Sequence, residues 1–230
     1  MRVCANEQQG KELAQKAGKQ LPAWISEMES TGFTSFYKVE NGKKWIYDRQ
    51  SKNYVIIPGT EDRVSLEVFR ASNKVWGNTD TTLVDLGDGI LNLEFHTKMN
   101  TIGGGVIEGI NKAIDLAEKD YKGLVISNTG GNFSAGANVG MIFMMAVEQD
   151  YDELNFAVKA FQDTMMRVRY SNIPVVVAPH NLALGGGCEL AMSCHFIIAS
   201  ENAIFGQPEV NLGIMVGYGG SQRLTQKLGK

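Results

Sequence analysis

The sequence predicts an α/β fold whose strands are largely parallel. From Thr82 onward, short apolar runs typical of buried strands alternate with stretches whose apolar residues recur at helical spacing. Two glycine-rich segments each follow a predicted strand and precede a predicted helix. Strands that alternate with helices usually form a parallel sheet with helices packed on its faces.

Residues 1–80 differ from the rest and are predicted to form a small α+β appendage or linker. "GKELAQKAGKQLPAWISEM" indicates a helix interrupted around Pro22. Asn41-Gly42 lies between alternating aromatic residues, which is a strong hairpin signal. "TEDRVSLEVFRASNKVWGNTDTT" is predicted to be a polar connector. We expect this part to be too small and too polar to hold much core.

The core is predicted over residues 81–230, and its elements follow in order. "TLVDLGDGILNLEF" alternates apolar and polar residues around Asp88-Gly89, which indicates a hairpin. "VIEGINKAIDLAEK" has the apolar period of a helix, and "GLVIS" is a buried strand that ends in the loop "NTGGNFSAGANVG". A long helix is expected over "YDELNFAVKAFQDTMMRVRY". It is followed by the strand "IPVVVAP", a glycine triplet with its helix, and the strand "FIIAS".

Composition excludes several classes of function. The net charge of −3 gives no reason to expect a nucleic-acid partner or an anionic membrane surface. No run approaches 18 apolar residues, and the first residues lack the apolar core of a secretory signal. Cys4, Cys188 and Cys194 are odd in number, and neither they nor the isolated histidines have a metal-binding spacing. We therefore expect a cytoplasmic protein with free thiols and no metal.

The stretch from Leu182 to Met192, "LALGGGCELAM", combines three glycines with Glu189 in an otherwise apolar run. A glycine-rich turn that opens a helix presents free backbone N–H groups, and the helix dipole adds positive potential. "GGNFSAGA" is a second junction of this kind. Two such turns aimed at one point would form an oxyanion hole, in which each donor typically contributes about 2.7–4 kcal/mol of transition-state stabilisation.

Other glycine-rich motifs fit these junctions less well. Neither junction has the Lys-Ser/Thr of a phosphate-binding Walker loop. The nearest dinucleotide-binding candidate, "GGGVIEG", has Glu108 where the third glycine belongs, so an NAD-binding domain is not expected. No G-x-S-x-G nucleophile motif occurs, and Ser134 is interpreted as a turn residue.

Two acids accompany the glycine-rich junctions. Glu189 opens a helix, and Glu209 in "FGQPEVNLG" follows after a strand and a turn. Taken alone, Glu189 is explained as an acid in the first turn of a helix, and Glu209 as a loop acid that follows a proline. Two acids beside two such junctions, with no other reactive polar group, favour a pair of carboxylates facing one cleft.

These motifs resemble the crotonase superfamily, and specifically enoyl-CoA hydratase. "SAGANVG", "ALGGGCELAMSC", "AIFGQPEVNLG" and "GYGGSQRLTQKLG" match in order, from about Thr82 to the last residue. The resemblance implies a crotonase-like fold, a repeated ββα superhelix, and hydration of 2-enoyl-CoA thioesters to 3-hydroxyacyl-CoA in fatty-acid β-oxidation. It also implies a C-terminally truncated chain, since the family continues with helices that cover the acyl pocket.

The resemblance implies roles for individual residues. Ala137 and Gly186 match the two N–H donors of the oxyanion hole, and Glu189 and Glu209 match the catalytic carboxylates, with acid and base unassigned. Gly217 matches a position whose N–H lies near the catalytic water. The remaining residues expected to bind substrate are Ala135, Gly136, Asn138 and Gly185.

Two positions depart from the family pattern. Asn138 stands where the family usually has an acid, and we expect altered loop hydrogen bonding without loss of activity. Val216 stands where proline is frequent, which is expected to loosen the loop beside Glu209.

The resemblance also bears on cofactors and partners. It implies no metal or redox cofactor, because coenzyme A is part of the substrate, and a homo-oligomer, trimer or hexamer, when complete. Residues 1–80 resemble the connector that follows the dehydrogenase domain of bifunctional β-oxidation proteins. A hydroxyacyl-CoA dehydrogenase domain or partner is therefore expected.

Three alternatives stay open from the sequence. An enoyl-CoA isomerase of the same superfamily would use the same oxyanion hole with other acids. The presence of both Glu189 and Glu209 favours hydration, because water must be bound as well as a proton moved. An inactive acyl-CoA-binding fragment is the second alternative, and an NAD-dependent dehydrogenase follows only from the expected neighbouring domain.

Overall fold

The computed structural model describes residues 7–40, 43–60 and 65–229, and the chain divides into two compact units, 1–68 and 69–230. The sequence places the change of character later, at residue 80. The difference arises because strand β4 (Lys74–Gly77) pairs with β5 (Thr81–Asp85) in the sheet of the larger unit.

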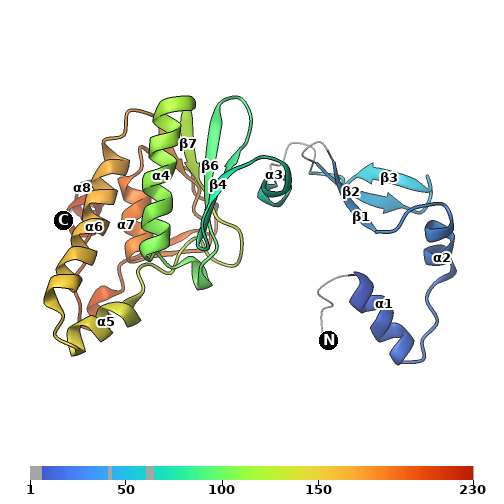
Figure 1. Ribbon diagram of the computed structural model, residues 1–230, viewed down its shortest axis with the longest axis horizontal. Coiled ribbons are helices and arrows are strands. Elements are labelled where there is room, and N and C mark those ends of the chain that lie inside the picture. The colour runs from blue at the N-terminus through green and yellow to red at the C-terminus, as the bar shows by residue number, and fades with distance from the viewer. Residues whose placement is uncertain (1–6, 41–42, 61–64, 230) are drawn as a thin grey trace. The chain divides into compact units, whose positions relative to one another are not determined.

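The small unit consists of two helices and a three-stranded antiparallel sheet (Figure 1). Its elements are α1 (Glu7–Lys16), α2 (Ala23–Ser30), β1 (Tyr37–Glu40), β2 (Lys43–Asp48) and β3 (Asn53–Ile56). Pro22 immediately precedes α2, so the predicted interruption separates two helices. Glu40 pairs with Lys43, as the predicted hairpin requires, while its turn at 41–42 lies outside the described residues.

Among its described residues, the small unit buries few apolar side chains. Ile25 and Met28 of α2 are buried. The ring of Phe33 lies 5.1 Å from that of Tyr47 and 5.2 Å from that of Tyr54, measured between centroids. Such tilted and edge-on aromatic contacts add to the gain from burial. These rings come together only when the sheet forms, so their separate positions in the sequence gave no sign of these contacts.

The large unit is built on a six-stranded sheet of order β10-β8-β7-β6-β5-β4. The strands beyond β5 are β6 (Ile90–Phe95), β7 (Gly123–Ile126), β8 (Val175–Val177) and β10 (Phe196–Ile197). β4, β5 and β6 run antiparallel, and the pairings from β6 to β10 are all parallel. β9 (Leu182–Leu184) and β11 (Ile204–Gly206) form a separate parallel pair. The prediction of largely parallel strands is confirmed.

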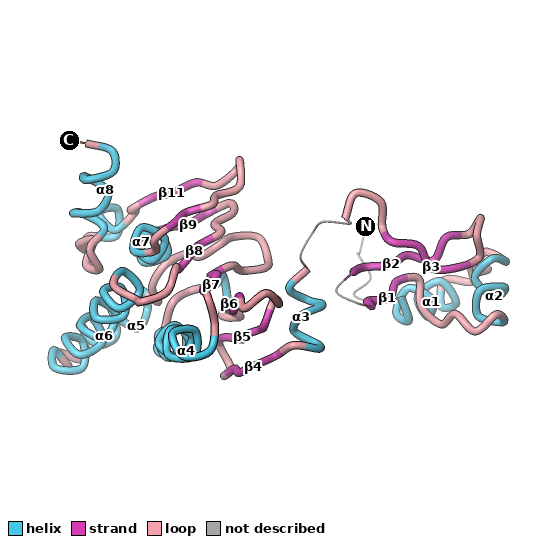
Figure 2. Tube along the Cα trace, turned by 90° about the horizontal axis from the view of Figure 1, so that it is seen from above, coloured by secondary structure: helices cyan, strands magenta, loops and turns pink. Residues whose placement is uncertain are grey.

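Helices α4 (Gly104–Asp120) and α6 (Tyr151–Arg169) pack against each other and lie side by side in Figure 2. α4 also packs on β5, β6 and β7. The stripe that it buries contains the residues that the helical period picks out: Val106, Ile110, Ala113, Ile114 and Ala117. The main hydrophobic core therefore lies between these helices and the sheet.

Several elements of the described chain were not predicted, β9 and β11 among them. α3 (Leu66–Ser72) and β4 lie within the predicted polar connector, of which residues 61–64 are outside the described part. β4 is a strand through its pairing with β5, a tertiary contact that its composition does not signal. α5 (Val139–Val147) was missed because "VGMIFMMAV" is apolar throughout and has no helical period.

The elements around the two acids are short. β9 leads through Gly185 into α7 (Gly186–Ser193), which is buried along its whole length. β11 leads into a 3-10 helix (Glu209–Leu212), and α8 (Gly220–Leu228) follows. Within the described residues, no helix is both long enough and apolar enough to span a membrane.

Candidate active site

The two glycine-rich junctions pack directly against each other. Ser134 N donates to Leu182 O at 3.1 Å, and Leu184 N donates to Ser134 O at 3.0 Å. Gly136 has φ +92°, and a Cβ there would lie 2.7 Å from Leu184 O and 3.1 Å from Gly186 N. Only glycine fits this backbone conformation and this close approach.

The packing brings the N–H groups of Ala137 and Gly186 together. A Cβ on Gly186 would lie 3.3 Å from Ala137 N. Neither N–H donates a hydrogen bond to any residue that the structure describes. Gly186 is also the first residue of α7, where the helix leaves its N–H groups unpaired. Two adjacent free donors are the arrangement that binds a developing oxyanion.

Ser134 has a structural role in this loop. Its side chain is buried, its Oγ donates to Asn100 O at 2.7 Å, and the same Oγ accepts from Gly136 N at 3.1 Å. The hydroxyl thus holds the turn before the paired donors, in agreement with its interpretation as a turn residue.

Glu189 on α7 is fully buried. Its Oε1 accepts hydrogen bonds from Tyr218 N at 2.7 Å and Gly220 N at 2.8 Å. Its Oε2 is buried with no hydrogen-bond partner among the described residues. Glycine suits position 220, because a Cβ there would lie 2.6 Å from Val216 Cγ1 and 2.9 Å from Glu189 Cγ. One oxygen of this carboxylate is therefore anchored, and the other is buried without a partner among the described residues.

Burial raises the pKa of the Glu189 carboxyl. The N–H groups of Gly220 and Tyr218 act in the opposite direction, because they stabilise the carboxylate form. The charge of Glu209 raises the pKa further, and the charge of Arg223 lowers it. The two acids therefore lie close enough for the charge of Glu209 to act on the ionisation of Glu189.

Glu209 begins the 3-10 helix after Pro208 and is 8% exposed. The side-chain amide of Gln207, oriented with Nε2 toward the carboxylate, donates to both Glu209 oxygens at 3.1 Å. A Cβ on Gly185 would lie 2.8 Å from Glu209 Oε1. The second carboxylate therefore lies against the glycine triplet that carries Gly186.

A cavity of about 150 Å³ lies at this point and has mainly apolar walls. The predicted site residues that line it are Ala135, Gly136, Ala137, Gly185, Gly186, Glu209 and Gly217. Two other predicted residues do not line it. Glu189 is buried, and Asn138 is exposed and caps α5 by accepting from Met141 N at 3.4 Å. Asn138 therefore serves as a helix cap, a role that an acid at this position could also fill.

Sequence reasoning missed several residues of the site. Gln207, Tyr218 and Gly220 contact the two carboxylates. The run "GYGG" could have pointed to Gly220, since a glycine at a helix start permits close approach. The apolar walls come from α5, α6 and the segment after Glu209, and nothing local marks them: Val139, Ile142, Val158, Leu212, Ile214 and Met215.

Metal-binding and thiol chemistry have little support at this site. In the described part of the chain, no three His, Cys, Asp or Glu side chains gather as a metal site would need. Cys188 and Cys194 are unpaired and buried, while Cys4 lies outside the described residues. Burial raises the pKa of the Cys188 thiol to about 11, which disfavours the reactive thiolate.

Replacing Glu189 with glutamine is expected to change how stability depends on pH. Because burial raises the folded-state pKa, the folded protein keeps this proton to higher pH than the unfolded chain. Ionisation therefore lowers stability as pH rises from the ordinary value of 4.5 through the raised pKa. Glutamine cannot ionise, and its Oε1 can still accept from Tyr218 N and Gly220 N.

We expect Glu189→Gln to have a higher Tm than the parent at neutral pH, with the difference shrinking toward pH 4. Thermal unfolding by circular dichroism between pH 4 and 8 measures this. Glu201→Gln removes an exposed acid and should show no such trend. A difference that is constant across the pH range would contradict the raised pKa.

The chain matches the model of the family described as enoyl-CoA hydratase/isomerase over residues 86–230. It is 39% identical over 217 residues to a probable 3-hydroxyacyl-CoA dehydrogenase of Bacillus subtilis, covering 94% of this chain and 27% of that protein. It is 37% identical over 144 residues to a probable mitochondrial enoyl-CoA hydratase of Dictyostelium discoideum, covering 62% of this chain and 50% of that one. The chain thus spans about a quarter to a half of the length of these relatives.

Solved structures show the same likeness. Enoyl-CoA hydratase from Bacillus anthracis matches with TM-score 0.60 and 27% identity, covering 66% of this chain and 59% of that one. The enoyl-CoA hydratase from Thermoplasma volcanium matches with TM-score 0.59 and 28% identity, covering 66% and 60%. These likenesses confirm the fold that the sequence motifs predict.

Proposed function

Because this chain belongs to the enoyl-CoA hydratase/isomerase family, we propose that its site hydrates 2-enoyl-CoA thioesters to 3-hydroxyacyl-CoA thioesters in fatty-acid oxidation. The observation that carries the proposal is the position of two buried carboxylates, Glu189 and Glu209, beside the free N–H groups of Ala137 and Gly186. Hydration needs these two parts together: an acid–base pair for water and an electrostatic anchor for the thioester oxygen.

The paired donors would bind the thioester carbonyl oxygen of the substrate. Attack of water at C3 forms the C–O bond and pushes the electrons of the double bond onto that oxygen as an enolate. Ala137 N–H and Gly186 N–H would stabilise the enolate, because the two backbone segments lie close together and neither donor is used by the described protein. The apolar cavity of about 150 Å³ beside them would take the acyl chain.

The two glutamates would move the protons. One carboxylate accepts a proton from the attacking water, and the other acid delivers a proton to C2, so the product gains one water overall. The unpartnered Oε2 of Glu189 is suited to accept a hydrogen bond from that water. The raised pKa of Glu189 favours keeping a proton on this carboxyl, as the acid of such a pair must do. This chemistry needs no metal or redox cofactor, and coenzyme A enters as part of the substrate.

Residues 1–80 are proposed to connect the hydratase part to a dehydrogenase. The relative from Bacillus subtilis, named as a probable 3-hydroxyacyl-CoA dehydrogenase, matches 94% of this chain and therefore extends into the small unit. Other relatives are named as subunits of fatty acid oxidation complexes. A dehydrogenase domain or partner would consume the 3-hydroxyacyl thioester that the hydratase forms.

Product analysis tests the proposed reaction. The chain is incubated with a short 2-enoyl-CoA and, separately, with a 3-enoyl-CoA, and the products are identified by mass spectrometry. A 3-hydroxyacyl thioester, heavier than its substrate by one water, is expected from the 2-enoyl substrate. A product of unchanged mass with a shifted double bond would instead assign the isomerase reaction. Binding of both thioesters without turnover would contradict catalysis by this chain.

A further inference from the structure

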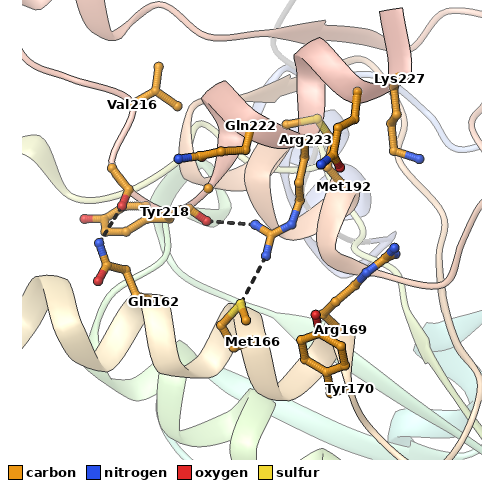
Figure 3. Close-up of a pocket in the computed structure, with 13 residues that line it drawn as sticks. Gln162, Met166, Arg169, Tyr170, Met192, Val216, Tyr218, Gln222, Arg223 and Lys227 are labelled. Carbon is orange, nitrogen blue, oxygen red and sulfur yellow. Dashed lines mark hydrogen bonds between the residues drawn. The ribbon is translucent and has the colours of Figure 1, made fainter.

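The loop that anchors Glu189 is held from its opposite side by two other side chains. A second cavity, of about 640 Å³, shares Gly217 and Tyr218 with the first cavity. In this second cavity Gln162 Nε2 donates to Gly217 O at 2.8 Å, and Arg223 Nη1 donates to Tyr218 O at 2.9 Å. Figure 3 shows Gln162 reaching up from α6 to the loop, with Arg223 approaching from α8.

The hydrogen bonds of Gln162 and Glu189 meet in a single peptide group. Gly217 C=O and Tyr218 N–H belong to the same peptide bond, and the described chain has no cis peptide bonds. In a trans peptide the C=O and N–H point in opposite directions. Gln162 therefore holds one edge of the peptide whose other edge donates to Glu189 Oε1 at 2.7 Å.

The neighbouring residue on α6 supports the same loop. The ring of Phe161 stacks on that of Tyr218, with centroids 3.8 Å apart and planes 7° apart. A Cβ on Gly186 would lie 3.0 Å from Phe161 Cζ, so this ring also borders the paired donors. Gln162 and Phe161, which are adjacent on α6, thus hold this segment at two points. Gln162 binds the carbonyl of Gly217, and Phe161 stacks on the ring of Tyr218.

We propose that Gln162 is a positioning residue for Glu189, acting through the Gly217–Tyr218 peptide; the catalytic consequence rests on the proposed hydratase function. A carbonyl that accepts a hydrogen bond makes the N–H of the same peptide a better donor. The amide of Gln162 also fixes the plane of that peptide, so that its N–H stays directed at Oε1. Without this contact the peptide can tilt, and the carboxylate form of Glu189 loses part of its stabilisation.

The titration of Glu189 reports this effect directly. Hydrogen bonds to a carboxylate lower its pKa, so weakening the bond from Tyr218 N–H should raise the pKa of Glu189. The other titratable groups around Glu189 are Cys188, Glu209, Tyr218 and Arg223. Their side chains form no described hydrogen bond with Gln162, so its replacement removes directly only the contact with the Gly217–Tyr218 peptide. A shift at Glu189 is therefore assigned to the peptide.

The test compares Gln162→Met with Gln226→Met by NMR titration of the Glu189 carboxyl carbon in protein labelled with ¹³C-glutamate. Methionine keeps the length of glutamine and removes the donor. Gln226 is exposed and lines the same cavity, which makes it the matched control. We expect an upward shift of the Glu189 titration midpoint in Gln162→Met and none in Gln226→Met. Coincident titrations in the parent and Gln162→Met would overturn the proposal.

The kinetic readout is separate from the titration. If the site hydrates 2-enoyl-CoA, Gln162→Met should lower kcat by about threefold to tenfold, the rate equivalent of one neutral hydrogen bond. KM should change little, and the limb of the pH–rate profile that Glu189 governs should move to higher pH. An unchanged profile in an active variant would count against the role of Gln162. A parent without turnover would contradict the proposed function, while the titration would still decide the role of Gln162.

Discussion

Glu209→Gln is expected to lower kcat for hydration of a short 2-enoyl-CoA by about 10²–10⁴-fold, the usual contribution of a positioned acid or base. Glutamine has nearly the shape of glutamate, and the residue lies at the wall of the cavity, so folding should be preserved. The variant loses the group that can take up or release a proton beside the paired donors. Loss of the absorbance of the conjugated thioester follows the reaction.

The control for this experiment is Glu201→Gln, which removes an exposed acid from the preceding segment. It should turn over substrate at the parent's rate. Activity of Glu209→Gln within threefold of the parent would remove Glu209 from proton transfer, and the hydration mechanism would need another acid. Binding of the substrate by Glu209→Gln is expected to remain near the parent's level, because the oxyanion donors are intact.

Gly186→Ala keeps the backbone N–H but places a methyl group beside the paired donors, and it is expected to lower kcat by about 10²–10³-fold, as much as removal of one oxyanion-hole donor does. The added methyl group would lie 3.3 Å from Ala137 N, close to the place that the thioester oxygen must occupy. It would also lie 3.0 Å from Phe161 Cζ, so that the ring has to shift slightly. Gly186 begins a helix, where alanine is readily accommodated, so activity should fall more than stability.

Gly104→Ala is the matched control, because Gly104 also begins a helix and nothing lies within 4 Å of its added Cβ. Steady-state kinetics and thermal unfolding of both variants separate blocking of the donors from general damage. Equal kinetics in Gly186→Ala and Gly104→Ala would show that the Ala137–Gly186 pair does not bind the reacting oxygen. A large loss of stability in Gly186→Ala alone would instead assign that glycine a packing role.

Elements with a clear local pattern could be predicted from the sequence. The helical period of α4 picks out the residues that it buries, such as Ile110 and Ile114. The glycine-rich junctions around Gly136 and Gly186 could be placed before helices because glycine allows the sharp turns that these positions need. β4 and α5 could not be predicted in this way. β4 is a strand because it pairs with β5, and the sequence of α5 has no helical period of apolar residues.

Part of the candidate site could be predicted in the same way. Glu189 and Glu209 stand out as acids in apolar surroundings next to glycine, and this information is local. The boundary between the two units and the core of the small unit were harder to predict from the sequence. The rings of Phe33 and Tyr54, for example, are far apart in the sequence and meet only in the folded unit.

The sequence by itself determined which residues are proposed to supply the chemistry: the carboxylates of Glu189 and Glu209, and the glycine turns that leave N–H groups free. Only the tertiary structure decided how these groups are held, with Glu189 anchored by Tyr218 N and that peptide held in turn by Gln162. The physical reason is the distance along the chain between the residues that interact. Backbone conformation and apolar period are set by neighbouring residues, whereas burial, pKa and convergence depend on segments that meet only when the chain packs.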